Sequence, residues 1–364
     1  MDRGKISGFQ FFCLFFVCRI TALFTFIVPG GLSSGDRVIF LLPFCAVCLA
    51  SVIPVMLVTD GGKKDIFTAA GRASPLLKRG LGIYYPALFL WTAAVSTARF
   101  ELFISTVMFP GSDTGMLTLL LLAGAAAAAS RGQETAGRSA VILFLLLCGS
   151  LVFILASSAG EFDVLNLSRP LADGSSPVLA AAFHSAARTT EIVSAAAASG
   201  FVKDGTRKST IAGITAFSAA AAVIFLLTGG VTGLYGERQM FPLYTMTVIA
   251  KAGIFERMDA FLTGFWVMCA FLKAAFYIML AVTSAQRCFN IEFGKPVYFV
   301  GAVVVFAVYR IISATTARFT DIITSSSFEY IFLFSAAALP LAVFFAIKIA
   351  DRRTKQTKQP EGMR

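Results

Sequence analysis

Residues 176–191 read Ser-Pro-Val-Leu-Ala-Ala-Ala-Phe-His-Ser-Ala-Ala-Arg-Thr-Thr-Glu, an alanine-rich apolar run that carries His184, Arg188 and Glu191. A charged side chain at the centre of a membrane helix costs roughly 2.5–3.5 kcal/mol on insertion scales and usually marks a substrate or ion path. The i, i+4, i+7 spacing predicts that the three side chains share one helical face, on which Arg188 and Glu191 can pair. Such a face is either a polar ligand site or proton relay, or a self-neutralising pair that fixes helix packing.

The composition around this run is that of a polytopic membrane protein. Of 364 residues, 57% are hydrophobic and 14% charged, with a mean hydropathy of +0.80, whereas soluble domains carry about 25% charged residues. We therefore predict an all-α fold of about ten transmembrane helices, since lipid cannot satisfy open backbone groups. The predicted spans are residues 6–28, 37–58, 81–109, 114–130, 138–157, 177–200, 209–234, 259–284, 296–316 and 328–350.

The distribution of basic residues predicts that both termini are cytoplasmic. Of the 31 lysines and arginines, 20 then lie in cytoplasmic segments, six in outer segments and five within spans, as the positive-inside rule requires. The first span is too long for a signal peptide and has no small-residue cleavage site after it. Residues 351–364 are expected to form a basic, disordered cytoplasmic tail, and the apolar segment 241–249 a short interfacial helix. The net charge of +11 needs no nucleic-acid partner, because anionic lipid heads explain it.

Charges near mid-span occur in only four spans, the first, third, sixth and eighth. The charged residues within spans are five basic ones and two acidic ones: Arg19, Arg99, Arg188, Lys273, Arg310, Glu101 and Glu191. Arg310 can snorkel from near a helix end and is expected to be structural. The excess of three positive charges favours an anionic or carboxylate-bearing ligand.

Ten spans divide into two halves of five, residues 6–157 and 177–350, within one transmembrane permease-like domain covering residues 1–364. An odd number per half makes the second half enter the membrane from the opposite side, which is the inverted-repeat architecture of many secondary transporters. The first and sixth spans are then equivalent, as are the third and eighth. We predict that these four spans surround the central site.

The third and eighth spans supply further candidate ligand-binding residues. Arg99 and Glu101 are two residues apart, so each needs a partner on another helix. Trp266, Lys273 and Tyr277 share one face of the eighth span. The Lys273 amine can hold a ligand carboxylate, occupy a cation position, or pair with Glu101 or Glu191.

Catalysis, metal binding and cofactors receive no support from the sequence. It contains one histidine and neither a G-x-S-x-G motif nor a phosphate-binding loop. All seven cysteines lie in or beside apolar spans, where small packing residues are expected. We expect neither an enzyme nor a resident cofactor or metal.

Several segments carry motifs of a known type. They are Lys5-Ile6-Ser7-Gly8-Phe9-Gln10, 131–138, 166–179, Phe241-Pro242, Phe255-Glu256-Arg257-Met258-Asp259-Ala260, Trp266 and Phe271-Leu272-Lys273. These segments resemble the motifs of the spore-germination permease family, the B subunits of nutrient germinant receptors within the amino acid–polyamine–organocation superfamily. The first segment is similar to the family's I-S-x-x-Q opening. In contrast to family relatives, the first span has no glycine around Phe16–Ala22.

The resemblance implies a LeuT-like fold, binding of a small nutrient such as an amino acid, and assembly with A and C subunits in the spore inner membrane. The alternatives are a secondary transporter of amino acids or small organic ions in a bacterial plasma membrane, and a scaffold that has lost ligand binding. The candidate ligand-binding residues are Arg19, Arg99, Glu101, His184, Arg188, Glu191, Trp266, Lys273 and Tyr277.

Overall fold

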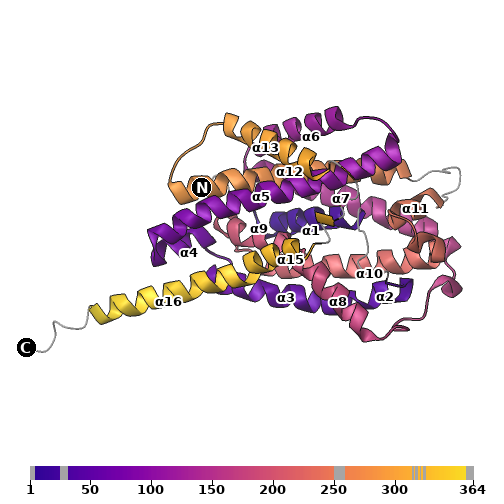
Figure 1. Cartoon of the computed structure of the whole chain (residues 1–364), viewed down its shortest axis with the longest axis horizontal. Helices are drawn as coiled ribbons and strands as arrows, with labels where there is room; N and C mark the ends of the chain where they lie inside the picture. Colours follow the sequence, from indigo (N-terminus) through magenta and orange to yellow (C-terminus); the bar gives the residue numbers. More distant parts are fainter. Residues whose placement is uncertain are drawn as a thin grey trace, which may run out of the picture.

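The computed structural model is a bundle of helices running roughly along the long axis of the molecule (Figure 1). It describes residues 5–24, 32–249, 259–313, 315, 319, 321–322 and 325–357. Within these residues the sole strand-like feature is one isolated bridge. The helices in the first half are α1 (Gly8–Phe24), α2 (Ser34–Ile39), α3 (Leu41–Val58), α4 (Ile66–Ala73), α5 (Pro75–Phe103) with the π-helix η2 (Ile104–Met108), α6 (Gly115–Ala129) and α7 (Gln133–Ser158).

The second half continues after two short 3-10 turns, η3 (Ala159–Glu161) and η4 (Val164–Asn166). Its helices are α8 (Ser175–Ala187), α9 (Glu191–Ala198) with the 3-10 turn η5 (Ser199–Phe201), α10 (Arg207–Glu237), α11 (Pro242–Ile249), α12 (Asp259–Phe289), α13 (Pro296–Ile312), α15 (Ser326–Leu333) with the π-helix η6 (Phe334–Ala338), and α16 (Leu339–Thr357). This all-α architecture confirms the predicted fold class.

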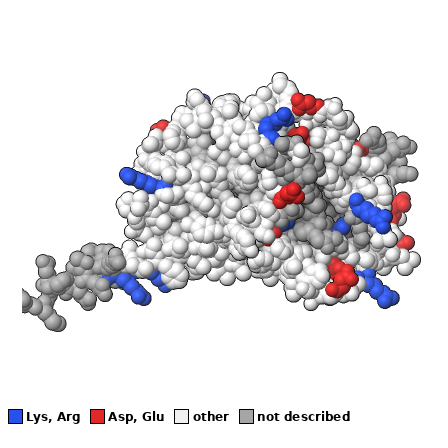
Figure 2. Space-filling model, viewed as in Figure 1, with Lys and Arg blue, Asp and Glu red and all other residues white. Residues whose placement is uncertain are grey.

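Each of the ten predicted spans corresponds to a helix or a pair of helices. Among the described residues, six helical segments are long and apolar enough to cross a membrane, and α1, α6 and α13 are shorter apolar helices. The sixth span is the broken pair α8–α9. Most of the face seen in Figure 2 is free of acidic and basic side chains, as expected for a surface in contact with lipid.

The helix ends differ from the sequence prediction in two places. Helix α5 begins at Pro75, six residues before the predicted start, because proline is favoured in the first turn of a helix. Helix α16 continues through residues 351–357, which were predicted to be a disordered tail; residues 358–364 lie outside the described part. The predicted short helix in segment 241–249 is present as α11, with Leu243 and Met246 buried.

The segment preceding α1 forms a backbone clip with the segment that follows α9. The Ile6 amide donates to the carbonyl of Phe201 at 2.9 Å, and the Lys203 amide donates to the carbonyl of Ile6 at 3.0 Å. The Ile6 side chain is fully buried and lies against Gly137 of α7, where a Cβ atom would be 2.9 Å from Ile6. The clip therefore ties the start of α1 to the end of α9.

The arrangement of the helix ends supports a labelling prediction. Helix α4 and the C-terminal end of α16 lie at one end of the molecule, and α2 and α11 lie at the other (Figure 1). In a variant lacking the native cysteines, a cysteine placed within residues 158–176 should react with an impermeant maleimide from outside. A cysteine placed within residues 63–79 should react only after permeabilisation. The reverse pattern would refute the predicted orientation.

Candidate central site at the break between α8 and α9

The sixth span is broken in the middle, so it is not the continuous helix that the sequence predicts. Helix α8 ends at Ala187 and α9 begins at Glu191, with Arg188, Thr189 and Thr190 between them. Neither glycine nor proline occurs at the break. The two threonines favour it, because β-branched side chains and competing hydroxyl groups weaken a helix locally.

Local contacts satisfy the polar groups that the break exposes. The Thr189 hydroxyl donates to the carbonyl of Ser185 at 3.3 Å, and the Thr190 hydroxyl bonds the Tyr277 hydroxyl at 2.9 Å. Arg188 lies at the C-terminal cap of α8 and Glu191 in the first turn of α9. Each charge is therefore at the helix end whose dipole favours it.

Glu191 contacts two of the basic side chains at the centre of the molecule. Its carboxylate is 1% exposed and accepts a hydrogen bond from the Lys273 amine on Oε1 at 2.9 Å. The other oxygen, Oε2, lies 3.8 Å from the Arg19 guanidinium. The expected pairing between Arg188 and Glu191 is wrong, because the break turns these two side chains toward different helices.

Lys273 also ties the eighth span to the first. Its amine donates to the carbonyl of Cys18 in α1 at 2.8 Å, and the Trp266 indole donates to the carbonyl of Thr21 at 3.2 Å. Trp266, Lys273 and Tyr277 all face α1 or the α8–α9 break, which confirms that they share one face of α12. Within its described residues α1 is a continuous helix.

Arg19 and Arg99 differ in the contacts of their guanidinium groups. The Arg19 guanidinium lies over the rings of Phe44 and Phe217, at 5.4 and 4.8 Å from their centroids, an arrangement that stabilises a desolvated cation. No hydrogen bond or ion pair among the described residues holds Arg99, and its buried Nε has no partner. Arg19 and Arg188 repel the Arg99 charge and Glu191 attracts it.

Arg188 pairs with Glu329 of α15, as does His184. The His184 Nδ1 lies 2.6 Å from Glu329 Oε2, and Arg188 bonds Oε1. The Glu329 side chain is 8% exposed and the Arg188 side chain 16%, whereas that of His184 is 45% exposed. These contacts join α8 to α15 beside the break. His184 and Arg188 therefore belong to a cluster with Glu329, whereas Glu191 belongs to a cluster with Lys273 and Arg19.

Glu329 is the residue that the sequence interpretation missed. It lies in the first turn of α15 after the capping residue Ser325, at the edge of the tenth predicted span. The sequence feature that could have identified Glu329 is its carboxylate within the apolar run Phe328-Glu329-Tyr330-Ile331-Phe332. Adding it to the two acidic residues counted within spans lowers the excess positive charge from three to two.

A small polar cavity lies at the break between α8 and α9. Its volume is about 30 Å³, enough for one or two water molecules and too small for an amino acid. The cavity therefore has no room for such a ligand in this conformation. Its polar lining comes from four spans: Arg19, Thr92, Ser96, Arg99, Arg188, Thr190, Glu191 and Lys273.

Glu101 is not among the residues that line this cavity. Its Oε1 accepts a hydrogen bond from the Thr114 hydroxyl at 3.0 Å, just before α6. Arg310 of α13 lies close enough for its charge to interact with Glu101 and Asp113. The structure therefore separates Glu101 from Arg99 and from the other candidate residues.

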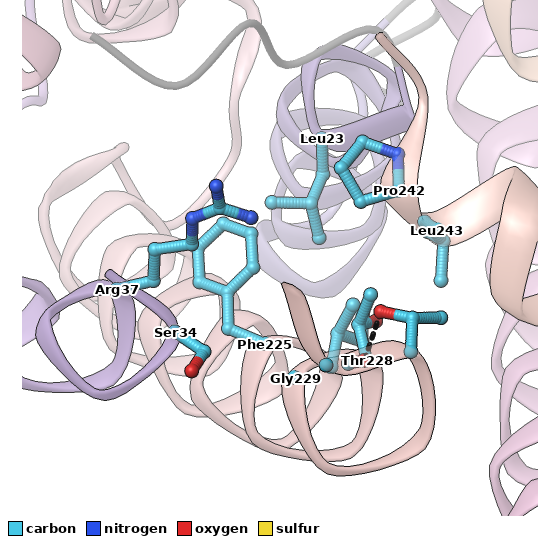
Figure 3. A pocket seen from close by; sticks show the side chains of 11 residues that line it. Leu23, Ser34, Arg37, Phe225, Thr228, Gly229, Pro242 and Leu243 are labelled. Atoms are coloured by element: carbon cyan, nitrogen blue, oxygen red, sulfur yellow. Dashed lines mark hydrogen bonds between the residues drawn. The ribbon is translucent and has the colours of Figure 1, made fainter. Parts of the chain in front are cut away.

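A second small cavity lies between α1, α2, α10 and α11, and its lining is shown in Figure 3. Its volume is about 20 Å³, room for about one water molecule. Arg37 of α2 lies beside Phe225 at its edge (Figure 3) and donates from Nε to the carbonyl of Leu32 at 3.0 Å. None of the predicted site residues lines it.

The comparisons with solved structures establish the fold. A nucleobase-cation-symport-1 family transporter, in a closed conformation with bromovinylhydantoin bound, is similar with a TM-score of 0.65 and 11% identity, over 96% of this chain and 94% of that one. A substrate-bound, outward-open Na⁺-coupled sialic acid symporter is similar with a TM-score of 0.59 and 13% identity, over 98% and 91% of the two chains. The fold is thus a LeuT-type transporter fold.

The sequence comparisons identify the family. No curated protein matches the sequence. Residues 5–318 match the profile of the spore permease family, described as spore germination protein. This range includes the N-terminal clip, the α8–α9 break and the Trp266–Tyr277 face. Its Phe255–Met258 motif lies outside the described residues. The chain is an integral membrane protein with a non-enzymatic permease fold, and it belongs to the spore germination protein family.

Proposed function

We propose that the chain is the membrane subunit of a spore nutrient-germinant receptor. It binds a small nutrient such as an amino acid in the central cavity and passes the signal to A and C subunits in the spore inner membrane. The main support for the proposal is the environment of Arg99. Its guanidinium lies at a polar cavity, and it has no ionic partner among the described residues.

The charges at the cavity favour a ligand that carries a carboxylate. Four cationic side chains and two acidic ones, Glu191 and Glu329, belong to the cavity and its ion pairs. The amides of Ile192, Val193 and Ser194 in the first turn of α9 already donate to the carbonyls of Thr189 and Thr190, so side chains must supply the donors to the ligand. A ligand carboxylate at Arg99 would offset one of the two excess charges.

Ligand entry requires the cavity to enlarge from its present volume of about 30 Å³. The Glu329 contacts with Arg188 and His184 close the space between α8 and α15. We propose that these contacts open to admit the nutrient. Movement of α8 relative to α9 would then carry the binding event to the partner subunits.

Replacing Arg99 with glutamine should weaken nutrient binding about ten- to a hundredfold, the equivalent of one charge-assisted hydrogen bond of roughly 1.5–3 kcal/mol. Protein abundance should be preserved, because no ion pair among the described residues is broken. Thermal-shift titration of the purified chain with individual amino acids measures the affinity, and a germination assay measures the response. Arg310→Gln, which changes an exposed arginine of α13, is the matched control. Equal affinity in the Arg99 and Arg310 variants would exclude Arg99 from the site.

The second candidate function is secondary transport of amino acids or small organic ions. It is favoured by the likeness to two transporters over 94% and 91% of their chains. Uptake of a labelled amino acid into proteoliposomes, against its gradient, distinguishes the two. A nutrient that shifts the melting temperature but is not taken up supports the receptor.

We also propose that residues 6–157 and 177–350 are inverted repeats. The support is that the first, third, sixth and eighth spans supply most of the polar residues at the cavity. An experimental structure in the oppositely facing state would test this, because inverted repeats should exchange conformations between the two states. A state in which the halves keep their present conformations would argue against the repeat.

A further inference from the structure

A larger cavity than these lies away from the central site, as an apolar groove between α6, α7 and α12. Its volume is about 510 Å³, within the 300–1,000 Å³ typical of small-molecule sites. The lining is almost wholly apolar and includes Leu120, Ala128, Ile142, Leu143, Met268 and Phe271. No predicted ligand-binding residue contributes to it.

The groove exists because α6 and α7 pack against α12 more than against each other. Both helices contact α12 extensively and contact each other little. Near that turn the lining side chains are small, with Ala128, Ala129 and Ala136 on the walls. Gly124 allows the Phe271 ring to form the floor, because a Cβ atom there would lie 3.0 Å from the ring.

Positive charge stands at the end of the groove where α6 turns into α7. Arg131 is exposed and lies two residues after the lining residue Ala129. Arg138 is adjacent to the lining residue Ser139 but forms an ion pair with Glu134. Arg131 forms no ion pair among the described residues, so the turn keeps a net positive charge.

We propose that this groove binds an anionic phospholipid from the leaflet on the side of the α6–α7 turn. One acyl chain lies in the groove between α6 and α7, against Phe271. The phosphate lies at Arg131, within hydrogen-bonding reach of the Thr135 and Ser139 hydroxyls that line the same end. Arginine binds phosphate oxygens in a bidentate manner, which favours an anionic head group.

The shape and charge of the groove favour a lipid over a partner helix. Its floor is the Phe271 ring and its walls near the α6–α7 turn are small side chains. The exposed Arg131 stands at that end. A helix could cover the groove without filling it, whereas a flexible hydrocarbon chain can enter and follow the Ala128–Ala136 walls.

The test uses the full purified chain in nanodiscs that contain phosphatidylglycerol or phosphatidylcholine with a photoreactive acyl chain. We expect labelling of α6, α7 or α12 to be about tenfold stronger with phosphatidylglycerol. Arg131→Gln should reduce it to the phosphatidylcholine level. Arg72→Gln, an exposed arginine of α4 at the same end of the molecule, should leave it unchanged.

A second pair of variants tests the groove itself. Ser139→Phe should place a ring in the groove and reduce labelling by both lipids, whereas Val152→Phe, at an exposed position of the same helix, should not. If Ser139→Phe fails to fold, Thr135→Phe at an exposed lining position replaces it. Three results would overturn the proposal: equal labelling by the two lipids, labelling unaffected by Ser139→Phe or Thr135→Phe, or loss of labelling when a partner subunit is bound.

Discussion

Replacing Lys273 with methionine should reduce the free energy of unfolding by roughly 3–5 kcal/mol, the cost of leaving a buried charge unpaired. The Glu191 carboxylate would keep Arg19 at 3.8 Å as its remaining ionic partner, and the Cys18 carbonyl would lose a donor. We expect low abundance in the membrane and a low melting temperature after solubilisation.

Two double variants identify the partner of Lys273. Lys273→Met with Glu191→Gln should recover part of the abundance, because both members of the ion pair are neutral and the Arg19 guanidinium keeps its contacts with the Phe44 and Phe217 rings. Lys273→Met with Glu101→Gln should not, because Glu101 bonds Thr114 outside the cavity. Normal abundance of the single Lys273→Met variant would show that the ion pair contributes little to stability.

The second large effect is expected from Glu329→Gln. This change leaves Arg188 without its carboxylate and should cost about 3 kcal/mol, the lower end of the range for a buried pair, since Arg188 and His184 keep some contact with solvent. Helices α8 and α15 should separate more easily. A cysteine introduced at Ser96, which lines the central cavity, should then react faster with a small maleimide.

The control for Glu329→Gln is His184→Gln, which removes the more exposed of the two contacts and should have the smaller effect on melting temperature. Adding Arg188→Gln to Glu329→Gln should restore part of the stability, because the Arg188 charge is removed together with its carboxylate partner. An unchanged reaction rate at position 96 in the Glu329→Gln variant would show that these contacts do not close the cavity.

The fold was predictable because composition decides it. The chain has 57% hydrophobic residues, and they form ten separated runs. In lipid, such runs must form helices so that their backbone N–H and C=O groups are hydrogen-bonded. The break in the sixth span was not predictable in the same way. It occurs at Arg188-Thr189-Thr190, where no glycine or proline marks it, and hydroxyl contacts with Ser185 and Tyr277 from the surrounding fold maintain it.

The site was predicted in outline, and the pairing within it was not. The mid-span position of their charges predicted that Arg19, Glu191 and Lys273 lie close together, because each charged side chain needs a partner away from lipid. The structure places them together. Spacing along one helix wrongly paired Arg188 with Glu191, because helical periodicity does not continue across a break. Glu329 was missed since it lies near a helix end, where an acidic residue ordinarily reads as part of the first turn.

The backbone clip at Ile6 couples the start of α1 to the segment that follows α9. Its two hydrogen bonds use main-chain atoms of Ile6, Phe201 and Lys203, so their strength does not depend on which side chains occupy these positions. We therefore expect the start of α1 to shift together with the end of α9 if the break between α8 and α9 changes shape. A fluorophore attached just before Lys5 would follow that movement from the aqueous side, without any label inside the membrane.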